Sequence, residues 1–261
     1  MSLTKSIFVT GAASGIGRET ARLFGANGWF VGMVDLDPEG LKSLETDIGP
    51  DRCFKRVMDV TDPEGYRAAV AAFAEKNGGK MDALFNNAGI LRMGLNESIP
   101  LSEQHRIVDI NVKGILTGID CSLPFLKQTS GARIISMCST SSLYGIPELA
   151  VYSATKHAVA ALTEALSLEL ERYGIIVSDI IVPYVNTPMI TAARAQAYSV
   201  QSTGINVQPR QVAETVWKAA HGKKIHWKIH YLTYVLFASF WAFPFLRRPI
   251  AKYLCLTPVK H

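Results

Sequence analysis

Acidic residues are missing from the last part of the chain. From Lys223 to the end there is no Asp or Glu, although seven Lys and Arg residues lie there. The formal net charge of +5 therefore belongs to this tail, because the remainder carries 20 basic and 22 acidic residues. A main body without excess positive charge argues against a nucleic-acid-binding protein.

Cysteine is also scarce, with four residues in a chain of 261. Their spacing fits neither a disulfide framework nor a metal site, so reduced thiols of a cytoplasmic protein are expected at Cys53, Cys121, Cys138 and Cys255. No secretory signal peptide is expected, because a strand-like run at 7–9 follows Lys5 too soon for an apolar leader. No metal is expected either, since zinc spacing is absent among His221, His226 and His230.

No linker rich in Pro, Gly or Ser, no internal repeat and no low-complexity run divides the chain. The length suits one large α/β domain with an appendage. We therefore expect a catalytic domain over residues 1–230 and a hydrophobic helical tail with basic flanks over 231–261.

Short apolar runs alternate with amphipathic segments along the first 230 residues. Strands are expected at 6–10, 29–34, 53–58, 81–85, 132–139, 175–182 and 223–229. Each parallel pair of strands needs a crossover connection, so this alternation predicts an α/β fold with a Rossmann-like, doubly wound parallel sheet of about seven strands. Ligands of such sheets bind at the carboxyl ends of the strands.

A glycine-rich turn follows the first expected strand and reads Gly11-Ala12-Ala13-Ser14-Gly15-Ile16-Gly17. A strand, a glycine turn and a helix together present backbone N–H groups and a positive helix end to a pyrophosphate. Side chains at the glycine positions would hold the phosphates away. The turn is thus predicted to bind a dinucleotide, and the alternative is an ordinary tight turn.

Acidic and small residues end the next strands. Asp35 lies 24 residues after Gly11, where a carboxylate accepts both ribose hydroxyls and repels a 2′-phosphate, which favours NAD over NADP. The alternative for Asp35 is a solvated acid at a strand end. Asp59 and Val60 follow the third strand and are predicted to flank the adenine. The fourth strand ends in residues that let the backbone approach a cofactor, Asn87, Ala88 and Gly89.

Tyr152 and Lys156 are four residues apart on a helix expected over 149–172. This spacing places the phenol and the ammonium group on one helix face. A cation there favours the phenolate, so the phenol becomes a general acid and base for a carbonyl or an alcohol. The spacing alone is weak evidence, because many surface helices contain it.

Taken in order, these motifs resemble the short-chain dehydrogenase/reductase family over residues 5–230. The resemblance rests on Thr10-Gly11-x-x-x-Gly15-Ile16-Gly17, Asp59-Val60, Asn86-Asn87-Ala88-Gly89, Asn111, Ser139, and Tyr152 with Lys156. It implies that Ser139 orients the substrate oxygen while Tyr152 transfers the proton. It implies further that Lys156 lowers the pKa of the phenol and binds the nicotinamide ribose.

The resemblance carries further expectations. Asn111 would distort its helix, which is expected over 102–128 with an interruption near Gly114, and would hold a water beside the lysine. Cofactor contacts are expected from the loop after the sixth strand, at Pro183, Val185 and Thr187. Members of the family usually assemble through the helices that hold the asparagine and the tyrosine, so a homo-oligomer is expected.

The chain departs from the family after the sixth strand. The usual motif is Pro-Gly-x-Val-x-Thr, whereas Pro183-Tyr184-Val185-Asn186-Thr187 lacks the glycine and is one residue shorter. Tyr184 is therefore expected to cover the nicotinamide or the substrate. If the family geometry holds, an apolar substrate pocket is lined by Leu91, Met93, Leu143, Tyr144, Tyr184 and Met189. These side chains suggest a steroid, a retinoid or a long-chain alcohol.

The stretch 229–246 holds 18 residues without a charged side chain, and a single helix of that length would measure about 27 Å. Three alternatives are open: a membrane span, an interfacial helix with Lys and Arg at anionic headgroups, and a helix buried against the domain or a sister subunit. Either of the last two could also wall the substrate cleft.

The sequence thus predicts an NAD-dependent oxidoreductase that interconverts an alcohol and its carbonyl on a lipophilic substrate. Two other functions stay open: a dinucleotide-binding sensor without turnover, and a scaffold tethered to a membrane.

Overall fold

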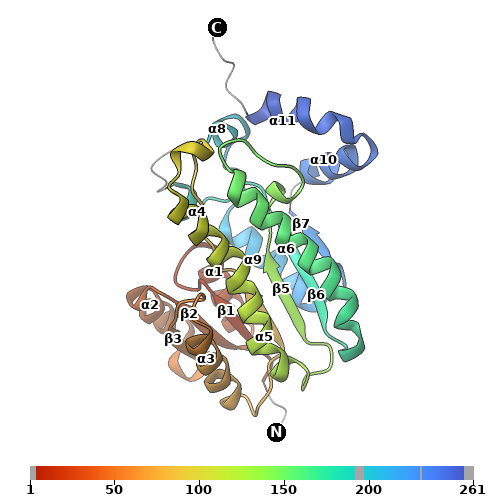
Figure 1. The fold of residues 1–261 in the computed structure, drawn as a ribbon. Helices are drawn as coiled ribbons and strands as arrows, with labels where there is room; N and C mark the ends of the chain where they lie inside the picture. The colour runs from red at the N-terminus through yellow and green to blue at the C-terminus, as the bar shows by residue number, and fades with distance from the viewer. Residues whose placement is uncertain (1–3, 192–196, 230, 256–261) are drawn as a thin grey trace.

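The computed structural model describes residues 4–191, 197–229 and 231–255. Their strands form one seven-stranded sheet in the order β3-β2-β1-β4-β5-β6-β7, in which every pairing is parallel (Figure 1). The strands are β1 Ser6–Thr10, β2 Phe30–Asp35, β3 Cys53–Val57, β4 Ala83–Asn86, β5 Arg133–Met137, β6 Ile176–Ile181 and β7 His226–Lys228. The predicted Rossmann-like, doubly wound sheet is confirmed.

Helices cover both faces of this sheet. They are α1 Gly15–Ala26, α2 Pro38–Ile48, α3 Pro63–Glu75, α4 Leu101–Val108, α5 Gly114–Leu126, α6 Ala150–Glu169, α7 Pro188–Thr191, α8 Tyr198–Thr203, α9 Pro209–His221, α10 Tyr231–Ala242 and α11 Arg247–Cys255. One apolar core joins the sheet to α1, α2 and α9, and a second joins it to α3 and α5. The order of the strands reverses beside β1, which neighbours both β2 and β4. A ligand crevice is expected at this point, at the carboxyl ends of the strands.

The helical stretch around Asn111 contains a π-helical turn. The turn spans Asp109–Lys113 and separates α4 from α5. Its wider winding turns Asn111 inward, where the side chain is fully buried. Its Oδ1 accepts from the N–H of Ile90 at 2.8 Å, and its Nδ2 donates to the carbonyl of Ile90 at 2.9 Å. The expected interruption before Gly114 therefore fixes the loop after β4.

The apolar stretch of the tail does not form a single helix. α10 ends at Ala242, and a short 3-10 turn at Pro244–Leu246 leads into α11. Pro244 lacks the N–H that would continue the helix, which explains the break. Among the residues that the structure describes, no helix has both the length and the apolar character needed to cross a membrane.

The tail lies over the end of the domain. Figure 1 shows α10 and α11 in dark blue near α8, at the end of the molecule opposite the N-terminus. Phe240 is buried, and its ring meets that of Tyr144 edge to face at 5.2 Å between centroids. Cys255 at the end of α11 is also buried, in an apolar cluster that includes Leu91 and Ile190.

An ionisable pair joins the last two strands. The side chain of Asp179 on β6 is fully buried, and its Oδ1 lies 3.0 Å from Nδ1 of His226 on β7. Glu164 approaches the other ring nitrogen of His226 at 3.4 Å. The hydrogen bond to Asp179 raises the pKa of His226, whereas burial raises the pKa of Asp179. The two carboxylates also raise the pKa of His226 electrostatically, whereas the charge of Lys228 lowers it.

Replacing Asn111 with Ala should lower the free energy of unfolding by about 2 to 4 kcal/mol, because both backbone groups of Ile90 lose their partner in a buried place. Urea denaturation measures the change. The matched control is Asn96→Ala, whose side chain is exposed and which should change stability by less than about 0.5 kcal/mol. Equal effects of the two variants would contradict a special role for the π-helical turn.

The raised pKa of His226 should make stability depend on pH. A group whose folded pKa lies above its unfolded value stabilises the fold fully below the unfolded pKa, here about 6.5, and this contribution is lost as the pH rises through the folded pKa. The urea midpoint should therefore fall from about pH 6.5 upward. In His226→Gln this part of the fall should disappear, and a variant with the unchanged pH profile would contradict the assignment.

Candidate active site

In the glycine turn between β1 and α1, backbone atoms approach each other closely. Gly11 and Gly15 have φ angles of +66° and +52°, which side chains disfavour. A Cβ atom at Gly17 would lie 2.0 Å from the carbonyl oxygen of Gly11. The first turn of α1 holds no acidic residue, and the side chain of Ser14 makes no capping hydrogen bond. The start of α1 therefore suits an anionic group such as a pyrophosphate.

Asn87 anchors this turn to the end of β4. Its Nδ2 donates to the carbonyl oxygens of Thr10 and Gly11, both at 3.0 Å. In return, the hydroxyl of Thr10 accepts from the N–H groups of Asn87 and Ala88, also at 3.0 Å. The amide of Asn87 thus ties neighbouring strands together, which holds the glycine turn and the loop after β4 side by side.

Asp35 lies beside the same turn, at the end of β2. Its carboxylate accepts from the N–H of Ala13 at 2.9 Å and from the N–H of Asp37 at 3.1 Å. The nearby guanidinium of Arg18 is directed elsewhere: it donates to the carbonyls of Ala13 and Gly40 and pairs with Asp47 at 2.9 Å. The carboxylate of Asp35 is therefore held in place by backbone donors rather than by a cation.

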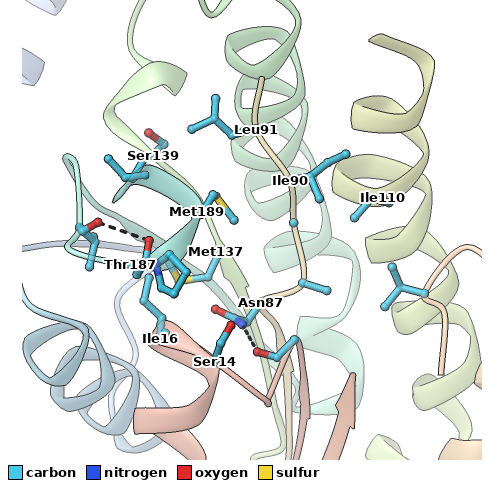
Figure 2. Close-up of a pocket in the computed structure, with 18 of the residues that line it drawn as sticks. Ser14, Ile16, Asn87, Ile90, Leu91, Ile110, Met137, Ser139, Thr187 and Met189 are labelled. Atoms are coloured by element: carbon cyan, nitrogen blue, oxygen red, sulfur yellow. Dashed lines mark hydrogen bonds between the residues drawn. The ribbon is translucent and has the colours of Figure 1, made fainter. Parts of the chain in front are cut away.

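One continuous cleft runs along the carboxyl ends of the strands. Figure 2 shows Ser14, Ile16 and Asn87 at one end of it and Ser139 with Leu91 at the other. The predicted cofactor residues that line it are Gly11, Ser14, Gly15, Ile16, Asp35, Asp59, Val60, Asn87, Ala88, Gly89, Tyr152, Lys156, Pro183, Val185 and Thr187. Gly17 does not line the cleft, since its contribution is the close approach of α1 to Gly11.

The cleft is lined by the carboxylate of Asp35 and by the catalytic candidates Ser139, Tyr152 and Lys156, an arrangement that suits a dinucleotide. The fit rests on the geometry of the glycine turn, which leaves backbone rather than side chains facing the start of α1. On this arrangement Asp35 would hold a ribose and Val60 an adenine, while Lys156 would meet the second ribose.

Three of the four predicted catalytic residues line the same cleft: Ser139 after β5, and Tyr152 and Lys156 on α6. Nζ of Lys156 lies 5.5 Å from the centroid of the Tyr152 ring and donates to the carbonyl of Met137 at 2.8 Å. Oγ of Ser139 lies 3.2 Å from Oγ of Ser141. Asn111 stands behind the cleft, where its Nδ2 also lies 3.3 Å from Oγ1 of Thr155.

Burial dominates the titration of these groups. It raises the pKa of Tyr152, whereas the interaction with Ser139 lowers that pKa. Burial also lowers the pKa of Lys156. The prediction that Lys156 brings the pKa of the phenol toward neutrality stays a prediction. With its pKa raised by burial, the phenol of Tyr152 is protonated at neutral pH.

The predicted substrate residues separate into three groups. Leu91, Tyr184 and Met189 line the cleft. Met93 and Tyr144 pack in the neighbouring apolar cluster that contains Cys255, while Leu143 borders a different cavity beneath Phe240. The hydroxyl of Tyr184 lies 2.6 Å from Oγ of the buried Ser199, which ties the loop after β6 to α8.

Some functional positions were missed by sequence reasoning. The cleft is also lined by Val34, Leu36, Met58, Ile90, Arg106, Ile110, Met137, Cys138, Val182, Pro188 and Ile190. Several of these directly precede or follow predicted residues at the carboxyl ends of strands. Including one more residue on either side of each strand end would have found them. Cys255 had no such signal, since its Sγ meets the hydroxyl of Tyr144, 111 residues away, at 3.7 Å.

The remaining candidates lie apart from the cleft. His221 packs against the ring of Trp217 at 4.4 Å between centroids, and His226 pairs with Asp179. His230 lies outside the described residues. Within the described part of the chain, no group of three His, Cys, Asp or Glu residues is arranged to hold a metal ion.

Comparison with known proteins places this site in a family. The sequence model of the family described as short chain dehydrogenase matches residues 5–197. Levodione reductase of Leifsonia aquatica is 32% identical over 73% of each chain, and cyclohexanol dehydrogenase of an Acinetobacter species (strain SE19) is 30% identical over 81% of this chain and 86% of its own.

Solved structures agree with the sequence match. The 3-ketoacyl-(acyl-carrier-protein) reductase of Brucella melitensis, crystallised with NADH, is 30% identical and superposes with a TM-score of 0.78 over 87% of this chain and 98% of its own. The match covers the glycine turn, the strand ends and the Tyr152–Lys156 helix together. On this evidence the chain belongs to the short-chain dehydrogenase family of oxidoreductases.

Proposed function

We propose that this protein interconverts an alcohol and its carbonyl by hydride transfer, with NAD as cofactor and Tyr152 as the general acid and base. The observation that carries the proposal is the convergence of Ser139, Tyr152 and Lys156 on one cleft whose far end holds Asp35. The two named relatives act on a levodione and a cyclohexanol by their titles, which supports a carbonyl or alcohol substrate.

The residues divide the reaction between them. A bound nicotinamide supplies the hydride to a carbonyl carbon, or accepts it from an alcohol carbon. In reduction, the hydroxyl of Ser139 donates a hydrogen bond to the substrate oxygen, and Tyr152 donates its proton to that oxygen. The ammonium group of Lys156, with Nζ 5.5 Å from the centroid of the Tyr152 ring, stabilises the resulting phenolate electrostatically. In oxidation the same phenolate removes the proton from the alcohol.

The preference for NAD rests on Asp35. Its carboxylate stands where a 2′-phosphate would meet a negative charge, and Arg18 is already bound to Asp47 and two carbonyls. The solved structure bound to NADH supports a nicotinamide cofactor.

A lipophilic substrate is supported by the substrate end of the cleft. Leu91, Met189 and Ile190 line it, and an apolar cluster with Tyr144 and Cys255 lies directly behind. These side chains would bury an apolar alcohol or ketone of the steroid, retinoid or long-chain kind. A dinucleotide sensor without turnover is the other candidate, and the complete catalytic set argues against it.

Two properties of the whole protein follow as proposals. All four cysteines are buried and free, which suits a reducing compartment such as the cytoplasm. We also propose that copies pair through α4, α5 and α6, because Leu116 and Leu168 are 45% and 75% exposed there.

The decisive variant is Tyr152→Phe. It should lower kcat by about 10² to 10⁴, because the proton donor is lost, while binding of NADH measured by calorimetry stays within about twofold. Steroid, retinoid and long-chain substrates are offered, and reduced nicotinamide is followed by absorbance. Tyr173→Phe, at an exposed position, is the control and should keep full activity. Undiminished turnover in Tyr152→Phe would refute the mechanism.

Replacing Asp35 with Asn should raise the ratio of kcat/KM for NADP to that for NAD by about tenfold or more, since the charge that repels the 2′-phosphate disappears. The comparison uses the exposed Asp51→Asn variant, whose ratio should equal that of the unchanged protein. If the unchanged protein prefers NADP, the assignment of Asp35 is wrong.

A further inference from the structure

The tail exposes apolar surface that a globular domain would ordinarily bury. α10 has no charged residue and is apolar on every side, which is typical of a helix enclosed by protein or lipid. It meets the domain through Phe240, whose ring contacts that of Tyr144. Tyr234 and Val235 on the same helix are 47% and 40% exposed.

The turn after α10 also exposes large apolar side chains. Phe243 and Phe245 are 52% and 72% exposed, and their rings contact each other at 6.0 Å between centroids. Arg247 and Arg248 follow at once and are also exposed. We call residues 243–248 the aromatic corner. It lies in the part of the tail that Figure 1 shows at the end of the molecule opposite the N-terminus.

All Lys, Arg, Asp and Glu positions from residue 223 to the end of the chain are basic. Lys223, Lys224 and Lys252 are exposed like the two arginines, and no Asp or Glu occurs from residue 223 onward. Transfer into an apolar phase stabilises exposed phenyl rings. Arginine side chains a few ångströms away are stabilised by phosphate groups. The boundary between the headgroups and acyl chains of an anionic bilayer offers both together.

We propose that the aromatic corner, which includes Arg247 and Arg248, docks this protein on the surface of an anionic phospholipid bilayer. The contact is peripheral, because α10 spans 12 residues and is too short to cross. α11 leads from the corner to Cys255 in the apolar cluster behind the cleft. If the proposed lipophilic substrate is correct, docking therefore brings the substrate end of the cleft close to the lipid.

Cosedimentation of the full chain with vesicles tests the docking without any turnover. The protein should pellet with vesicles of phosphatidylcholine and phosphatidylglycerol, bind less at high salt, and bind pure phosphatidylcholine weakly. Phe243→Ser with Phe245→Ser should lower the partition coefficient by about tenfold or more, and Arg247→Gln with Arg248→Gln by roughly tenfold.

Matched controls alter exposed residues of the same kinds elsewhere. Leu95→Ser, and Lys42→Gln with Lys80→Gln, should leave vesicle binding unchanged. The proposal is overturned if the unchanged protein stays in solution, or if the corner variants bind vesicles as the controls do. It is also overturned if the corner variants change only the oligomeric state in size-exclusion chromatography, since the corner would then contact a second copy. Loss of enzyme activity in any assay would bear on the proposed reaction and not on the docking.

Discussion

The missing side chain at Gly17 is the constraint on which the cofactor end of the molecule depends. It lets α1 begin against the carbonyl of Gly11, an oxygen that also accepts from the amide of Asn87. One backbone oxygen thereby joins a strand, a helix and the loop of the neighbouring strand. Asp35 is then fixed by the same turn through the N–H of Ala13. The shape of the cleft thus follows from close contacts between backbone segments, and these contacts depend on the small size of the residue at position 17 rather than on a functional group.

A different balance governs the catalytic end. Lys156 is buried and Tyr152 is half-buried, so each loses solvation of its charged form, and the pKa of the phenol rises while that of the ammonium falls. The hydrogen bond from Lys156 to the carbonyl of Met137 connects α6 to the end of β5. Ser139, two residues further along the chain, is placed by the same junction. Fold and reactivity are therefore set by one buried contact between a helix and a strand.

Local patterns explain how much of this could be predicted from the sequence. The strands, the glycine turn and the helix with Tyr152 depend on short-range periodicity and on residues with special backbone freedom. The π-helical turn at Asn111 was expected only as an interruption, because its partner Ile90 lies on another element. Leu143 was expected in the wrong cavity and Cys255 was missed, because the surroundings of both residues depend on where the tail packs. The tail was treated as one helix, whereas the structure breaks it into two at Pro244.

The tail has a consequence for how the substrate end of the cleft is built. The family match ends at residue 197, whereas the apolar cluster behind the cleft also contains Val200 of α8 and Cys255 at the end of α11. Leu91 and Ile190, which lie within the matched region, therefore share one cluster with residues beyond it. A change of sequence in α8 or α11 would alter this apolar wall without touching the glycine turn or α6.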